Sequence, residues 1–208
     1  MACLLLPATA HAGKKRSKPK RRGGQAEVLA GASACLPGPG DCKDDSLGKT
    51  APSVGMAFDI GYRAHPGFFI GAGYQVGWFN PTWSLEDDQP EFSNAYQQGI
   101  FGVLRGYWSL WRFDIGFELA PGWSRQTFVR SEGDTRHYSQ GFALRPGLSL
   151  DIFVSRHVFL GAKADVIFNL HRQICERTGN DTICEGGLDI RQARVHQLIG
   201  GVHVGGVF

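Results

Sequence analysis

The sequence predicts an all-β protein, an eight-stranded antiparallel up-and-down barrel that crosses a membrane. From about Pro52 onward, apolar and polar residues alternate with period two over runs of about 11 to 16 residues. Short turns and long polar loops separate these runs in strict alternation. No window holds roughly 18 consecutive apolar residues, so no transmembrane helix is expected. A closed barrel can still cross a bilayer, because it satisfies every backbone hydrogen bond internally.

The alternation places seven strands, and topology supplies the eighth. If the C-terminus is periplasmic, the run from Pro52 to Arg63 travels inward, so an earlier strand must travel outward, and Gln25–Ala34 is the candidate. Each run reaches the roughly 9 to 11 residues that a tilted membrane strand needs. We therefore expect strands at about Gln25–Ala34, Pro52–Arg63, Phe68–Trp78, Ile100–Trp108, Arg112–Trp123, Tyr138–Ile152, Arg156–His171 and Ala193–Phe208.

The connections predict which end of the barrel is which. Short turns are expected near Ala64–Gly67, Ser109–Trp111 and Ser155–Arg156, and long polar loops at Asn80–Ser93, Thr127–Arg136 and Arg172–Gln192. Short periplasmic turns and longer extracellular loops are typical of outer-membrane barrels. The sequence therefore predicts a cell outer-membrane location, with the turns inside and the loops outside.

The polar faces predict a charge-paired lumen. An eight-stranded barrel has an interior just wide enough for side chains to fill, and ions buried there must be paired. The alternation assigns equal numbers of cations and carboxylates to this interior: Asp59, Arg63, Arg105, Arg112, Asp114, Glu118, Arg145, Asp151, Lys163 and Asp165. The opposite faces carry aliphatic side chains, with Tyr and Trp toward the strand ends as in an aromatic girdle. The lumen is interpreted as a structural plug, with an ion or water path as the alternative.

The N-terminal part of the chain is expected to lie outside the barrel. Residues 1–12 contain a short apolar stretch and Ala10-His11-Ala12, an A-x-A cleavage pattern, so they are interpreted as a signal peptide that lacks its basic beginning. Residues 13–24 hold seven of the 22 basic residues, and we expect a disordered basic periplasmic tail. Residues 25–208 are expected to form the barrel domain.

Charge and cysteine content exclude several classes of site. Outside the tail, acidic residues outnumber basic ones, and the tail has no aromatic residue for base stacking, so nucleic acid is not an expected partner. Cys35 with Cys42, and Cys175 with Cys184, are spaced as two loop-closing disulfides of an oxidising compartment. The two cysteines of each pair are farther apart in the sequence than the paired cysteines of a typical zinc site, and we expect neither a metal nor a cofactor.

The C-terminus adds a family resemblance. The chain ends in His203-Val204-Gly205-Gly206-Val207-Phe208, and a terminal Phe208 on an alternating strand resembles the signal that such barrels present to the barrel-assembly machinery. Gly206 stands where these signals usually carry a large apolar residue. With the strand plan, residues 25–208 look like the small OmpA/OmpX-type barrels. The resemblance implies a structural or adhesive surface role, with outer-membrane lipid and lipopolysaccharide as surroundings.

Three alternatives compete with this non-enzymatic interpretation. His137-Tyr138-Ser139 is similar to the His-x-Ser segment of outer-membrane lipid A deacylases, but the nearest acid, Asp151, lies about 46 Å along the strand from His137 (at about 3.3 Å per residue). We therefore assign no catalytic residue. A small pore is the second alternative. A soluble lipocalin-like barrel, with the two faces exchanged, is the third.

Overall fold

The computed structural model describes residues 18–36, 49–82, 92–131, 133–186 and 196–208, and all its regular elements are strands. The described part contains no helix that could span a membrane. The strands are β1 (Gly23–Leu36), β2 (Lys49–His65), β3 (Phe68–Thr82), β4 (Phe92–Leu110), β5 (Phe113–Arg130), β6 (Thr135–Phe153), β7 (Val158–Thr178), β8 (Asp181–Gly186) and β9 (His196–Val207).

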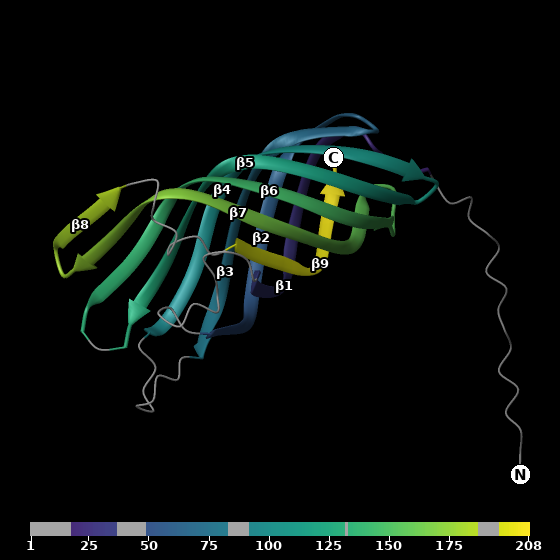
Figure 1. Ribbon diagram of the computed structural model, residues 1–208. Coiled ribbons are helices and arrows are strands. Elements are labelled where there is room, and N and C mark those ends of the chain that lie inside the picture. Colours follow the sequence, from purple (N-terminus) through teal and green to yellow (C-terminus); the bar gives the residue numbers. More distant parts are fainter. Residues whose placement is uncertain (1–17, 37–48, 83–91, 132, 187–195) are drawn as a thin grey trace, which may run out of the picture.

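Eight of the strands close into an antiparallel ring. Each strand from β1 to β7 pairs with its successor, β7 also pairs with β9, and β9 pairs with β1. The β1–β9 pairing, which closes the ring, runs from Gln25 opposite Val207 to Leu36 opposite His196. Figure 1 shows the tilted strands wrapping around the barrel, with β8 projecting at its far end. The predicted fold is confirmed, including the topological inference of a strand at Gln25–Ala34.

We call the end with the short turns the periplasmic end and the opposite end the extracellular end, as the sequence predicts. At the extracellular end the strands are longer than predicted. β5 and β6 continue to Arg130 and from Thr135, so the expected loop Thr127–Arg136 is a tight connection. Likewise β7 runs to Thr178 and turns into the short strand β8, where a long loop was expected. These two loop predictions were wrong because polar composition marks where the wall leaves hydrocarbon, whereas the strand ladder continues in water. The third predicted loop, Asn80–Ser93, lies mostly outside the described residues.

The outer wall has an apolar band of membrane height. On β5, the outward residues Phe113, Ile115, Phe117, Leu119 and Trp123 are all exposed. From Phe113 to Trp123 there are about ten residues, or about 33 Å of strand, which a tilt of about 40° reduces to about 25 Å. That is the height of the lipid-facing band in outer-membrane barrels. A lipocalin-like barrel would need the opposite faces, so that alternative is wrong.

The N-terminal segment joins the periplasmic end of the barrel before β1 begins. Arg21 Nε lies 2.9 Å from Asp114 Oδ1, and the Lys20 amide donates to the Arg156 carbonyl at 2.7 Å. β1 itself begins at Gly23, two residues before the predicted barrel. The prediction of disorder up to Gly24 is therefore wrong for these last residues, because Arg21 finds a buried carboxylate. The signal peptide and residues 13–17 of the tail lie outside the described residues.

Candidate functional site

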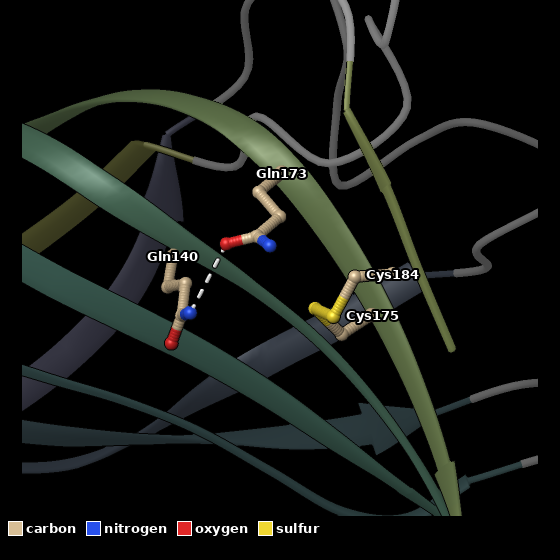
Figure 2. Close-up of a disulfide and its surroundings, with 4 residues drawn as sticks. All are labelled: Gln140, Gln173, Cys175 and Cys184. Carbon is tan, nitrogen blue, oxygen red and sulfur yellow. Dashed lines mark hydrogen bonds between the residues drawn. A yellow bond between two sulfur atoms is a disulfide. The ribbon is translucent and has the colours of Figure 1, made fainter. Parts of the chain in front are cut away.

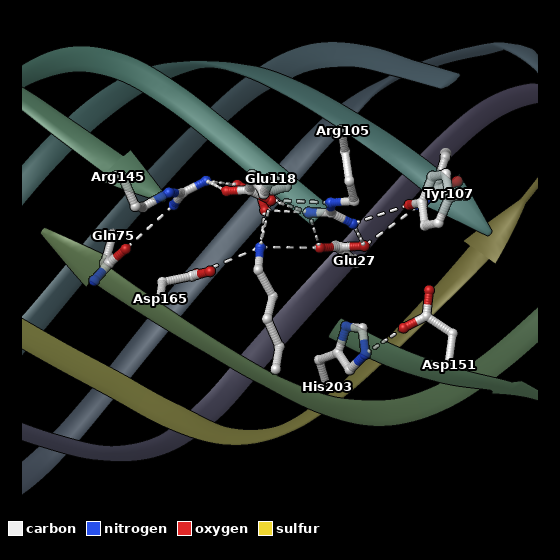
Figure 3. A network of polar contacts seen from close by, with 12 residues as sticks. Glu27, Gln75, Arg105, Tyr107, Glu118, Arg145, Asp151, Asp165 and His203 are labelled. Atoms are coloured by element: carbon white, nitrogen blue, oxygen red, sulfur yellow. Dashed lines mark hydrogen bonds and ion pairs between the residues drawn. The ribbon is translucent and has the colours of Figure 1, made fainter. Parts of the chain in front are cut away.

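The middle of the lumen holds a cluster of buried ions, which we call the central cluster: Glu27, Asp59, Arg105, Glu118, Arg145, Lys163 and Asp165. Six strands supply them, namely β1, β2, β4, β5, β6 and β7. All seven side chains are at most 6% exposed. In Figure 3, the labelled side chains of Arg105, Arg145, Glu118 and Glu27 converge from different strands on the barrel axis.

Each cation of the central cluster contacts several carboxylates. Arg105 Nη2 lies 2.6 Å from Glu27 Oε1, 3.0 Å from Asp59 Oδ2 and 2.5 Å from Glu118 Oε2. Arg145 Nη2 lies 2.8 Å from Asp59 Oδ1 and 2.7 Å from Glu118 Oε1. These shared contacts replace the water that the ions lose on burial, which is the condition for tolerating a buried charge.

Lys163 contacts all four carboxylates of the central cluster. Its Nζ lies 2.6 Å from Asp59, 3.0 Å from Glu118, 3.3 Å from Glu27 and 3.4 Å from Asp165. The cluster therefore sets three cations against four carboxylates. Asp165 is the most weakly held carboxylate, because neither of its oxygens receives a hydrogen bond from the described residues.

Aromatic rings and glycines shape the space around these ions. The guanidinium of Arg145 lies 4.8 Å from the ring centre of Phe101, and that of Arg105 lies 5.4 Å from the ring centre of Phe69. Both rings are buried and belong to an apolar layer within the lumen. A Cβ at Gly73 would lie 2.1 Å from Asp59 Oδ1, so any larger residue there would require Asp59 to shift within the cluster. The lumen is thus packed with apolar as well as ionic side chains, a feature that the sequence analysis missed.

Three further predicted lumen residues pair in a second layer near the periplasmic turns. Arg63 Nη1 lies 2.8 Å from Asp114 Oδ2, and the Arg63 guanidinium also donates to the Pro66 carbonyl and stacks 3.8 Å from the Tyr107 ring centre. Asp151 Oδ1 lies 2.8 Å from His203 Nε2. This layer and Arg21 fill the periplasmic end of the barrel.

Arg112 does not lie among the lumen ion pairs, where the sequence predicted it. It lies with Trp111 in the turn between β4 and β5, and its Nε donates to the Phe153 carbonyl at 2.7 Å. It caps a backbone group at the barrel rim and contributes nothing to the central cluster. Trp111 has a φ of 54° in this tight turn. The next strand, β5, therefore begins at Phe113, one residue later than predicted.

Glu27 is the largest omission from the predicted set. It is 4% exposed and contacts both Arg105 and Lys163. Its strand was placed from topology alone, without assigning its faces. The signal was present, because Gln25, Glu27 and Leu29 occupy alternate positions that the register turns into the lumen.

A third polar layer lies toward the extracellular end. Ser139 Oγ lies 2.8 Å from His171 Nδ1, and Ser124 Oγ lies 2.8 Å from His171 Nε2. Ser124 also donates to Asn169 Oδ1 at 2.6 Å. The partner of Ser139 is therefore His171 on the neighbouring strand. His137, which the His-x-Ser resemblance pairs with it, instead accepts a hydrogen bond from Arg130 Nε at 3.0 Å.

The remaining sequence features lie at the two ends of the barrel. Cys175 and Cys184 face each other across β7 and β8 and form a disulfide (Figure 2). Cys35 lies near the end of β1, but Cys42 is outside the described residues, so their pairing stays a prediction. The Phe208 amide donates to the Gly24 carbonyl at 2.8 Å, and its side chain is exposed; its role as an assembly signal also stays a prediction.

Comparison with known proteins supports the fold through structure alone. No protein-family model and no curated protein sequence matches the chain. Neisserial surface protein A superposes with a TM-score of 0.56 at 12% identity, over 89% of this chain and 96% of that chain. A major outer membrane protein from Thermus thermophilus gives a TM-score of 0.51 at 12% identity, over 89% of this chain and 99% of that chain. Together with the apolar outer wall, this likeness shows that the chain has the fold of a small eight-stranded outer-membrane β-barrel.

Proposed function

We propose that this protein is a non-enzymatic and non-conducting outer-membrane barrel with a structural or surface-interaction role. The observation that carries the proposal is the central cluster. Its seven buried side chains come from six of the eight ring strands and meet across the lumen at ion-pair distances of 2.5 to 3.4 Å. A conducting pore needs a continuous wetted path, whereas here arginine and lysine side chains reach across the barrel to opposite strands.

The extracellular hairpin supports the surface role. The hairpin formed by the end of β7 with β8 extends the wall beyond the membrane, and all six residues of β8 are exposed. Ile183 is 72% exposed in this strand, and the Cys175–Cys184 disulfide holds the hairpin together. A stapled hairpin with an exposed apolar residue presents a fixed surface to other molecules outside the cell.

An ester hydrolase is the second candidate, because a serine bonded to a histidine is the pairing that activates a nucleophile. The orientation of Ser139 argues against this activity. Ser139 and His171 are 5% and 1% exposed and face the lumen. A lipid ester on the outer wall would therefore not reach the hydroxyl.

The proposal is tested by recording purified, refolded protein in planar bilayers, with a general porin as the positive control. Heat-modifiable gel migration confirms folding of each preparation. We expect no discrete conductance steps, and reproducible steps from the folded band would overturn the proposal.

The enzymatic alternative needs a separate measurement. Lipid A from cells expressing the wild type is compared by mass spectrometry with lipid A from cells expressing Ser139→Ala. We expect identical masses. Loss of an acyl chain with the wild type and not with Ser139→Ala would establish the hydrolase.

A further inference from the structure

The outer wall of β4, β5 and β6 changes abruptly from apolar to polar toward the extracellular end. Ile100, Trp123 and Phe142 face one another in register on these strands and are 62%, 42% and 52% exposed. Two residues farther out, the same register brings the outward-facing Gln98, Arg125 and Gln140 into a second row. The boundary between hydrocarbon and headgroups therefore falls between these two rows.

The second row continues onto β7. Gln140 pairs with Gln173, and the Gln140 amide donates to Gln173 Oε1 at 3.2 Å. Figure 2 shows these two side chains pointing toward one another beside the disulfide. The register shift at Gln140 and Gly141 leaves Arg172, between His171 and Gln173, without a partner in the β6–β7 ladder, and Arg172 is exposed.

Two arginines thus flank β6 at the membrane boundary. They lie on β5 and β7, and two strand spacings of about 4.8 Å separate their backbones by about 10 Å. We call Arg125, Arg172, Gln98, Gln140, Gln173 and Tyr138 the boundary patch. Between them the patch residues offer two guanidinium groups and three amide groups on one stretch of wall.

The charge of the boundary patch is uncompensated within the described part of the chain. Arg125 stacks 3.7 Å from the Tyr138 ring centre, and its Nε is buried without a hydrogen-bond partner. No carboxylate of the described residues forms an ion pair with Arg125 or Arg172. A cation beside hydrocarbon is costly unless an anion accompanies it, so the missing partner is expected from the membrane itself.

We propose that the boundary patch binds the phosphate of a lipid A molecule in the outer leaflet. Guanidinium groups bind phosphate oxygens through two parallel hydrogen bonds, and the amides supply further donors. The short turns mark the opposite end of the barrel as periplasmic, so this row faces the leaflet built from phosphorylated lipid A. The exposed Trp123 and Phe142 directly below would contact its acyl chains. The inference rests on the proposed outer-membrane orientation.

The experiment measures lipid binding to the full chain refolded in nanodiscs of phosphatidylcholine. The probes are diphosphoryl lipid A, its dephosphorylated form and phosphatidylglycerol, detected by native mass spectrometry. The variants are Arg125→Gln with Arg172→Gln, and Arg172→Gln alone. The matched control is Arg156→Gln, an exposed arginine in a periplasmic turn.

We expect diphosphoryl lipid A to bind the double variant at least about tenfold more weakly, since each charged hydrogen bond lost costs about that factor. The affinity of the Arg172→Gln variant for diphosphoryl lipid A should lie between those of the wild type and the double variant. The Arg156→Gln variant should bind like the wild type. Equal binding by the double variant would overturn the inference. So would equal binding of the dephosphorylated form or of phosphatidylglycerol. Cell fractionation reports separately whether the protein reaches the outer membrane, so failure of the proposed outer-membrane location is distinguishable from failure of the site.

Discussion

Replacing Lys163 by methionine removes the one cation that contacts all four carboxylates of the central cluster. Methionine keeps much of the side-chain volume, so the change is mainly electrostatic. It leaves two arginines against four buried carboxylates, among which Asp59 loses a contact of 2.6 Å and Glu118 one of 3.0 Å. Breaking a buried ion pair on one side costs about 3–5 kcal/mol, because the remaining charge is left uncompensated. We expect the free energy of unfolding of Lys163→Met to fall by that amount.

A second variant separates charge from packing. Asp165→Asn removes the most weakly held carboxylate and leaves three cations with three carboxylates, so we expect its stability to stay within about 1 kcal/mol of the wild type. The double variant Lys163→Met with Asp165→Asn restores the wild-type excess of one carboxylate. It should therefore regain about 1–3 kcal/mol relative to Lys163→Met alone, since groups in contact couple by such amounts.

The measurement is urea unfolding in phosphatidylcholine vesicles, followed by tryptophan fluorescence and by heat-modifiable gel migration of the same samples. If Lys163→Met costs less than about 1 kcal/mol, buried ion pairing does not govern this lumen. If the double variant is no more stable than Lys163→Met, charge balance is not the reason for the loss.

The remaining predictions concern space and the extracellular hairpin. Gly73→Ala should destabilise the barrel by about 1–3 kcal/mol in the same unfolding assay, because the added methyl group would meet Asp59 Oδ1 at 2.1 Å; an unchanged midpoint would show that Asp59 can move aside. Cys184→Ser opens the bridge to Cys175, so trypsin should cut faster at the exposed Arg177 while the barrel stays folded; equal cleavage rates would mean that the strand pairing alone holds the hairpin.

The two faces of most strands could be predicted because alternation records them directly. Lys163 and Asp165 on one side of β7, and Leu160 and Phe168 on the other, are assigned by counting. The same counting could not find the ends of the strands, because strand pairing continues into water after the wall turns polar. It also misplaced Arg112, which lies beyond the last paired residue of the turn.

The partners within the lumen could not be predicted from the sequence. Counting shows which residues point inward, but contacts depend on the stagger between strands, which is set around the whole ring. Ser139 illustrates the difference. The neighbouring histidine in sequence, His137, was the obvious partner, yet the bulge opposite Gly141 brings His171 of β7 beside Ser139 instead.

The arrangement of the central cluster explains what the buried ions contribute beyond stability. A slip of one residue between two strands exchanges the faces of one of them. For β7 it would move Lys163 and Asp165 from the lumen into lipid, where a lysine at the bilayer midplane costs about 2–4 kcal/mol, and would at once leave Asp59 and Glu118 with fewer cations. A slipped register is therefore penalised on both sides of the wall, and the same holds for each of the six strands that supply an ion. If the lumen were apolar, a slipped strand would only exchange one apolar face for another, and the penalty would be smaller. The ion cluster therefore specifies a single strand register, which the contacts of the outer wall with lipid cannot do.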